Sequence, residues 1–197
     1  FKKNANNIQT FELLNKNILV VGFGRIGKKL IKRCLAFESK VYVYDPYVTE
    51  KIINEHGGIK INNIEEGLGI ADYVSLHMPL SKETKDLINY SILKKMKVNS
   101  IIVNTARGGI INESDLEKAL NEGIIFGAAL DVFTKEPIEI SNPLLKNKKV
   151  LLSPHSATFT DECTSRMGIE TTKNIIDFFE KKIDKSMMVK LWLISKE

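Results

Sequence analysis

The strongest constraint on the fold lies near the N-terminus, where an apolar run leads directly into three closely spaced glycines. The stretch from Ile18 to Val21 has the continuous hydrophobicity of a strand that is buried on both faces. Gly22, Gly24 and Gly27 follow in the spacing GxGxxG, and helical periodicity begins after them. The sequence therefore predicts a strand, a tight turn and the start of a helix.

Each glycine has a separate function in a turn of this kind. Gly22 permits the sharp bend, Gly24 leaves room for a pyrophosphate to touch the backbone, and Gly27 lets the helix pack closely on the strand. The free N–H groups and the positive end of the helix then face the phosphates. The pattern indicates dinucleotide binding. The alternative is that the three glycines only form a strand-to-helix turn.

A second predicted strand, residues 40–44, ends in Asp45, which lies 18 residues after Gly27. A carboxylate at about 20 residues from the glycines accepts hydrogen bonds from the adenosine ribose hydroxyls. It would also repel a 2′-phosphate, and the segment Pro46-Tyr47-Val48 has no arginine to bind one. We therefore expect NAD rather than NADP, unless Asp45 only ends a strand.

Predicted strands and helices alternate along the rest of the chain. We expect strands at 59–61, 71–77, 100–104, 124–130 and 150–152, and helices at 25–37, 49–56, 64–68, 91–97, 113–121 (capped by Asn112) and 160–182. Short turns between them specify an α/β fold with a doubly wound parallel sheet and helices on both faces. The predicted domain covers residues 15–182, after an N-terminal helical segment (1–14) and before a C-terminal tail (183–197).

Several polar side chains follow strand ends directly. Asp45, His77, Arg107, Asp131 and His155 come after five different predicted strands. Because the carboxyl ends of parallel strands share one edge of a sheet, where ligands bind, we expect these five residues at one edge. The order of the strands in space does not follow from the sequence.

Composition narrows the function classes. The net charge of +5 comes from lysines and arginines that are dispersed among acidic residues without interleaved aromatic residues, so we expect solvated faces and no nucleic-acid partner. No run approaches the ~20 apolar residues of a membrane span, and no signal peptide is recognised. Cys34 and Cys163 are distant from each other, which favours reduced thiols and a cytoplasmic protein. The scattered histidines and cysteines predict no metal site. Because the first residue is Phe1, we expect a cut or processed N-terminus.

Six segments carry distinctive motifs: VGFGRIG at 21–27, YDP at 44–46, SLHMPL at 75–80 with Thr84, VNTARGG at 103–109, ALDVF at 129–133 with Glu136-Pro137, and SPH at 153–155. In this order they resemble the NAD-binding domain of the D-isomer-specific 2-hydroxyacid dehydrogenases, which include phosphoglycerate dehydrogenase and glyoxylate or hydroxypyruvate reductases. The resemblance covers nearly all of the chain and implies a Rossmann-type domain. Any one of the segments alone would be weak evidence.

The resemblance implies a catalytic set of Arg107, Glu136 and His155. Reduction of a 2-keto acid requires a hydride from the nicotinamide and a proton for the substrate oxygen. His155 would supply that proton, and Glu136 would orient its ring and favour its charged form. Arg107 would hold the substrate carboxylate with its planar guanidinium group. Taken singly, each of the three could instead be an ordinary loop residue.

The same resemblance implies the residues that bind NAD. They are Gly22, Gly24, Arg25, Ile26, Gly27 and Asp45 at the glycine-rich turn and adenosine ribose, Met78, Pro79 and Thr84 beside the adenosine and pyrophosphate, and Thr105, Ala106, Arg107, Asp131, His155 and Ala157 on the nicotinamide side. His77 would line the crevice without a catalytic role, and His56 would lie on the surface.

The chain also departs from the family pattern. Family members have a substrate domain, which is largely absent here, so we expect NAD binding with half of the active-site cleft missing: the chain is a fragment or a short form. The apolar tail at 187–194 needs a partner surface, and the resemblance implies a homodimer. The main alternative to an oxidoreductase is a non-enzymatic, NAD-binding regulatory protein of the co-repressor type.

Overall fold

The structure, a computed structural model, describes residues 11–184, which form two compact units that divide between His155 and Ser156. The first unit holds all the strands, and the second holds the last helix, α6 (Asp161–Phe179). The predicted domain 15–182 spans both units, and its limits remain a prediction. Residues 11–14 contain no helix. The rest of the predicted N-terminal segment and the apolar tail lie outside the described residues.

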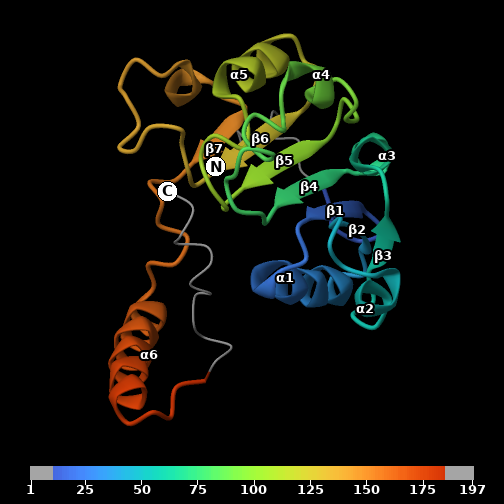
Figure 1. Ribbon diagram of the computed structural model, residues 1–197. Coiled ribbons are helices and arrows are strands. Elements are labelled where there is room, and N and C mark those ends of the chain that lie inside the picture. Colours follow the sequence, from blue (N-terminus) through green and yellow to red (C-terminus); the bar gives the residue numbers. More distant parts are fainter. Residues whose placement is uncertain (1–10, 185–197) are drawn as a thin grey trace, which may run out of the picture. The chain divides into compact units, whose positions relative to one another are not determined.

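Seven parallel strands form one sheet in the order β3-β2-β1-β4-β5-β6-β7 (Figure 1). They are β1 (Asn17–Val21), β2 (Lys40–Tyr44), β3 (Ile59–Ile61), β4 (Tyr73–Leu76), β5 (Ile101–Asn104), β6 (Gly127–Leu130) and β7 (Val150–Leu152). The strand order reverses between β1 and β4, and ligands of such sheets bind outside the carboxyl ends at this point. The predicted doubly wound α/β fold is confirmed.

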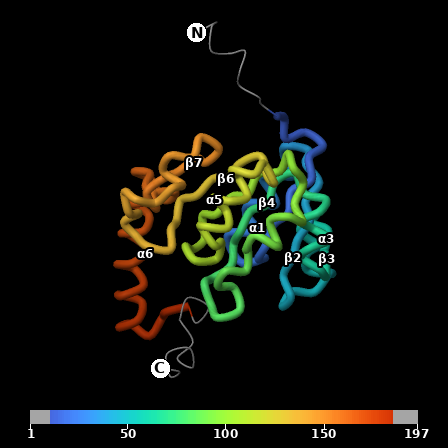
Figure 2. Tube along the Cα trace, turned by 90° about the horizontal axis from the view of Figure 1, so that it is seen from above, coloured from blue at the N-terminus to red at the C-terminus, as the bar shows by residue number. Residues whose placement is uncertain are grey.

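Helices cover both faces of the sheet (Figure 1). Seen from above, the labelled strands β2, β4, β6 and β7 follow one another across the sheet (Figure 2). One face packs on α1 (Arg25–Ala36) and α2 (Glu50–Asn54). The other packs on α3 (Ile64–Ile70), α4 (Tyr90–Leu93), α5 (Glu113–Asn121) and the 3₁₀ turn η2 (Pro143–Lys146). As predicted, Asn112 caps α5, and its side chain accepts a hydrogen bond from the Asp115 N–H.

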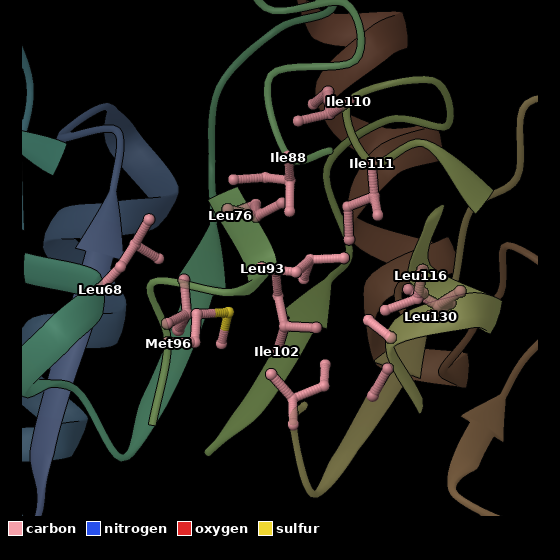
Figure 3. Packing of buried hydrophobic residues seen from close by; sticks show 14 of the residues in the cluster. Leu68, Leu76, Ile88, Leu93, Met96, Ile102, Ile110, Ile111, Leu116 and Leu130 are labelled. Carbon is pink, nitrogen blue, oxygen red and sulfur yellow. The ribbon is translucent and has the colours of Figure 1, made fainter. Parts of the chain in front are cut away.

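Two apolar layers hold these helices to the sheet. In the larger one, Leu76, Ile102 and Leu130 from three neighbouring strands lie with Leu93 of α4 and Leu116 of α5 (Figure 3). All five are at most 3% exposed, and each contributes about 1.5–3 kcal/mol through burial. The smaller layer joins α1 and α2 to β1 and β2. Both layers fix the sheet as a rigid platform whose edge carries the candidate site.

Two strands begin later than predicted, because backbone N–H groups before them form hydrogen bonds with the ends of the preceding helices. The strand expected at 124–130 begins only at Gly127, since the Ile124 N–H donates to the Ala119 carbonyl and closes α5. The strand expected at 71–77 begins at Tyr73, since the Ala71 N–H donates to the Gly67 carbonyl and closes α3. The 3₁₀ turn η2 was not predicted, and α4 and α6 are shorter than expected.

Asp72 joins two central strands at the amino end of the sheet. Its Oδ2 accepts a hydrogen bond from the Asn17 N–H at 2.8 Å, and its Oδ1 lies 2.9 Å from Lys97 Nζ. Burial alone would raise the pKa of Asp72, but the bonds from Asn17 and Lys97 outweigh it and lower the pKa below its usual value. The Asp72 carboxylate therefore stabilises the fold in its ionised form.

We expect Asp72→Asn to lower the free energy of unfolding by about 1 kcal/mol near neutral pH, because the amide loses the ion pair and has only one acceptor oxygen for the two donors, the Asn17 N–H and Lys97 Nζ. Since the folded pKa is depressed, the deficit should shrink as the pH falls through that pKa and the parent carboxylate becomes protonated. Urea unfolding at several pH values measures it. Glu55→Gln, at an exposed side chain of the same sheet domain, is the control. A deficit that does not depend on pH would contradict the interpretation.

Candidate active site

The carboxyl edge of the sheet is joined by contacts that run from β2 to β7, and the first of them ties Asp45 to the glycine-rich turn. Asp45 Oδ2 accepts a hydrogen bond from the Phe23 N–H at 2.8 Å, and Oδ1 accepts one from the Tyr47 N–H at 2.9 Å. A carboxylate offers about four lone-pair sites, so two remain for a ligand. The structure thus brings Asp45 and the turn together, as the sequence predicted.

Two glycines of the turn differ in what surrounds them. Gly22 has a φ of +101°, and a Cβ there would lie 2.5 Å from the carbonyl oxygen of His77, so the turn packs directly on the backbone after β4. Gly24 is exposed, and no atom lies within 4 Å of where its Cβ would be. Packing within the protein therefore explains Gly22 but not Gly24. Gly24 lies beside the N-terminus of α1, the position at which dinucleotide-binding turns approach a pyrophosphate.

The loop after β4 carries Met78, Pro79 and Thr84. Thr84 Oγ1 donates to the Pro79 carbonyl at 2.7 Å and accepts a hydrogen bond from the Ser81 N–H at 2.7 Å. The Asp86 N–H donates to the Gly109 carbonyl at 2.8 Å, which joins this loop to the loop that follows β5. The polar side chain of Thr84 therefore shapes the loop from within.

The loop after β5 carries Arg107 and is shaped by Asn104, a residue to which the sequence analysis gave no role. The Asn104 side chain is buried, donates from Nδ2 to the Arg107 carbonyl at 2.9 Å and accepts from the Ala106 N–H at 3.0 Å. Arg107 itself is exposed, and its Nη1 donates to the Ala106 carbonyl at 2.6 Å. An asparagine that ends a buried strand before a short loop is the signal that would have found this role.

A backbone contact joins the loops after β5 and β6. A Cβ on Gly108 would lie 1.8 Å from the Phe133 carbonyl oxygen, so only glycine permits this approach. Phe133 in turn donates its N–H to Glu136 Oε1 at 2.9 Å. Gly108 therefore brings the loop that carries Arg107 against the loop that carries Glu136.

The side chains of His155 and Glu136, two of the predicted catalytic residues, contact each other directly. His155 Nδ1 lies 2.7 Å from Glu136 Oε2. The hydrogen bond from His155, followed by that from the Phe133 N–H, lowers the pKa of Glu136 below its usual value. His155 has a φ of +52°, a backbone conformation that costs a side-chain-bearing residue free energy and that occurs often at functional sites.

Asp131 is the most buried of the predicted site carboxylates, and Ser153 orients it. Asp131 is 4% exposed, and its Oδ1 accepts a hydrogen bond from Ser153 Oγ at 2.5 Å. The Ser153 carbonyl also accepts the His155 N–H at 3.1 Å. Ser153 therefore links the carboxylate after β6 to the histidine after β7. The sequence showed Ser153 only as part of a motif, and its position at a strand end was the available signal.

The other two histidines lie on either side of the glycine-rich turn. His77 is partly buried, and burial lowers the pKa of its ring, whose Nε2 lies 2.8 Å from Ser75 Oγ. His56 is exposed, as expected, but its ring packs edge to face on Phe23 at 5.3 Å between centroids. His56 therefore supports the turn from the side of α2.

Arg25, Ile26 and Ala157 are three further predicted cofactor residues. Arg25 and Ile26 are exposed at the start of α1. Ala157 belongs to the second compact unit. Within residues 11–184, no three His, Cys, Asp or Glu side chains are grouped to hold a metal ion. In the same part of the chain, no helix is long and apolar enough to span a membrane.

We expect His155→Ala to raise the pKa of Glu136 toward its ordinary value, because the hydrogen bond from the histidine is the largest cause of the lowered value. NMR titration of the Glu136 side-chain carboxyl measures this in the absence of any ligand. The carboxyl of Glu83, whose pKa is lowered by the hydrogen bond from Ser81, should titrate alike in parent and variant. An unchanged Glu136 titration would contradict the pairing.

We expect Gly24→Ala to impair NADH binding and Gly27→Ala to impair stability. Gly24→Ala should leave the thermal midpoint nearly unchanged and weaken NADH binding about tenfold or more, since the space it fills is open to a ligand. Gly27→Ala should lower the free energy of unfolding by about 1–3 kcal/mol, because its Cβ would lie 2.2 Å from the Gly22 carbonyl oxygen. Gly168→Ala, with no atom within 4 Å, is the control for both measurements. Unimpaired NADH binding by Gly24→Ala would contradict the assignment.

Comparison with known proteins finds relatives over most of the chain. The family model described as "D-isomer specific 2-hydroxyacid dehydrogenase, NAD binding domain" matches residues 1–157. The glyoxylate reductase of Korarchaeum cryptofilum is 38% identical over 178 residues, and the match covers 90% of this chain and 53% of that protein. The D-3-phosphoglycerate dehydrogenase of Methanocaldococcus jannaschii is 40% identical over 164 residues, with 83% of this chain and 31% of that protein covered.

The fold comparison agrees. An NAD-complexed D-isomer specific 2-hydroxyacid dehydrogenase from Lactobacillus delbrueckii ssp. bulgaricus superposes with a TM-score of 0.81 at 27% identity, with 93% of this chain and 59% of that chain covered. The chain thus spans about half, or less, of the length of these relatives. The predictions of the family and of NAD as cofactor are confirmed. The chain belongs to the D-isomer specific 2-hydroxyacid dehydrogenases and carries their NAD-binding domain.

Proposed function

We propose that this domain works in an oxidoreductase that transfers a hydride between NAD and a small 2-hydroxy or 2-keto acid. The observation that carries the proposal is the pair of His155 and Glu136, 2.7 Å apart, at the same sheet edge as the glycine-rich turn and Asp45. A dinucleotide bound at the turn would extend along this edge. Its adenosine end would lie at the turn and Asp45, and its nicotinamide end near the pair of His155 and Glu136. The names of the relatives, glyoxylate reductase and D-3-phosphoglycerate dehydrogenase, support the substrate class.

The residues divide between the two halves of the cofactor. The Asp45 carboxylate accepts hydrogen bonds from the ribose hydroxyls of the adenosine. The backbone N–H groups of Arg25 and Ile26, at the start of α1, face the pyrophosphate. Met78, Pro79 and Thr84 line the adenosine side. Thr105, Ala106 and Asp131 line the nicotinamide side, together with Arg107 and His155. The open space at Gly24 supports this assignment.

When bound at the turn and Asp45, NADH would supply a hydride to the carbon atom of the substrate carbonyl, and NAD+ would accept it in the oxidative direction. His155 donates a proton from its ring to the oxygen that becomes the hydroxyl, and it takes this proton back in the oxidative direction. Glu136 remains ionised and holds His155 Nδ1, so that the other ring nitrogen faces the substrate. Arg107 binds the substrate carboxylate and polarises the carbonyl group.

The order in which the loops meet supports these roles. Gly108 holds the loop of Arg107 against Phe133, and Phe133 holds Glu136, which holds His155. A substrate between Arg107 and His155 would therefore be bound by groups whose spacing is set by the backbone contact at Gly108 and by the two hydrogen bonds of Glu136. The homodimer, the remaining part of the catalytic cleft and the choice among small 2-hydroxy acids stay predictions from the resemblance.

We expect His155→Ala to bind NADH within about twofold of the parent and to lose about 10²-fold or more in the turnover of glyoxylate, hydroxypyruvate or phosphohydroxypyruvate. NADH fluorescence measures binding, and the oxidation of NADH measures turnover, for the protein with its complete natural chain. Glu136→Gln should lower turnover as well, whereas Glu139→Gln on the same loop should not.

Retained turnover in His155→Ala would exclude the proposed proton donor. NADH binding without turnover of any of the three keto acids by the parent would favour the non-enzymatic, NAD-binding regulatory protein instead. No response of NADH fluorescence to the parent would contradict the dinucleotide site itself.

A further inference from the structure

A lysine at the edge of the sheet contacts the loop that carries Asp45, and the proposed chemistry does not use it. Lys60 lies in β3, the edge strand next to β2, and is paired with Val43. Its Nζ donates to the Asp45 carbonyl at 3.1 Å and also to the Val48 carbonyl. The ammonium group thus bridges the two ends of the loop of residues 45–48, which leads to Thr49, the N-cap residue of α2.

These contacts fix Asp45 from both sides. Its carboxylate accepts the Phe23 and Tyr47 N–H groups, at 2.8 and 2.9 Å, and its backbone carbonyl accepts the Lys60 ammonium. A carbonyl that bonds a charged donor is held more strongly than one that bonds a neutral donor. The orientation of the Asp45 carboxylate toward the glycine-rich turn therefore depends on a side chain from another strand.

Tyr47 lies at the tip of the same loop. The Tyr47 N–H donates a hydrogen bond to Asp45 Oδ1, and the residue as a whole is 91% exposed. The loop therefore presents an acceptor for ribose hydroxyls and a solvent-facing aromatic ring side by side. Lys60 joins the carbonyls on either side of Tyr47, so both groups would move if this bridge were lost.

We propose that Lys60 is a positioning residue for the adenosine half of the dinucleotide, acting through the loop of residues 45–48. The proposal rests on the dinucleotide site of the proposed function and adds a residue to it. Loops that are fixed before binding lose less conformational entropy when the ligand binds, so the bridge raises affinity without touching the ligand. The ligand chemistry concerned is an adenosine with free ribose hydroxyls.

A simpler interpretation of Lys60 is a solvated lysine that protects an edge strand from pairing with other chains. That interpretation predicts an ammonium group in water, and any charged or long polar residue would serve. The observed ammonium group instead bonds two backbone carbonyls of one loop and is partly buried. The two interpretations differ in what happens to ligands that contain adenosine.

We expect Lys60→Met to weaken the binding of NADH and of ADP-ribose by about tenfold, because the methionine fills similar space but cannot bridge the carbonyls. Binding of reduced nicotinamide mononucleotide, which lacks the adenosine, should be unchanged. Lys60→Arg keeps donors on a long side chain and should restore NADH affinity to within about threefold. Lys40→Met, at an exposed lysine of the adjacent strand β2, is the matched control.

A ligand-free measurement accompanies the titrations. Hydrogen exchange of the Tyr47 amide, followed by NMR, should accelerate in Lys60→Met and not in Lys40→Met, because the bond to Asp45 opens more often in an unbraced loop. Equal losses for the mononucleotide and for NADH would overturn the proposal, as would unchanged NADH affinity or a failure of Lys60→Arg to restore it. If the parent protein does not bind NADH, both the proposed function and the proposed role of Lys60 are overturned. If the parent and Lys60→Met bind NADH with the same affinity, only the proposed role of Lys60 is overturned.

Discussion

The close approach of backbone to backbone at the carboxyl edge of the sheet is the constraint on which the rest of the site depends. At Gly22 the turn after β1 touches the carbonyl of His77, and at Gly108 the loop after β5 touches the carbonyl of Phe133. A Cβ at either position would force two loops apart. Because backbone atoms have little freedom to adjust, these contacts set the distances between loops that come from strands far apart in the sequence.

Side chains complete what the glycines begin. Asn104 shapes the loop of Arg107, Ser153 links Asp131 to His155, and Glu136 joins Phe133 to the imidazole of His155. The apolar layers reach the same edge at Phe23 and Phe133. The polar contacts of the site are therefore continuous with the packing that holds the sheet.

The family assignment and the geometry support each other at different levels. The match to the family establishes the NAD-binding domain, whereas the contacts show how the loops of this particular chain meet. The chain spans about half, or less, of the length of these relatives.

The amino-acid sequence determined the fold class, because buried strands, glycines and capped helices have local signatures that do not depend on the partner strands. It also determined that Asp45, Arg107 and His155 share an edge, since parallel strands end on one side. Tertiary structure decided the strand order, the left-handed backbone of His155 and the bridge from Lys60. These depend on which loops become neighbours in space, and that follows from packing among residues distant in sequence, which no local pattern encodes.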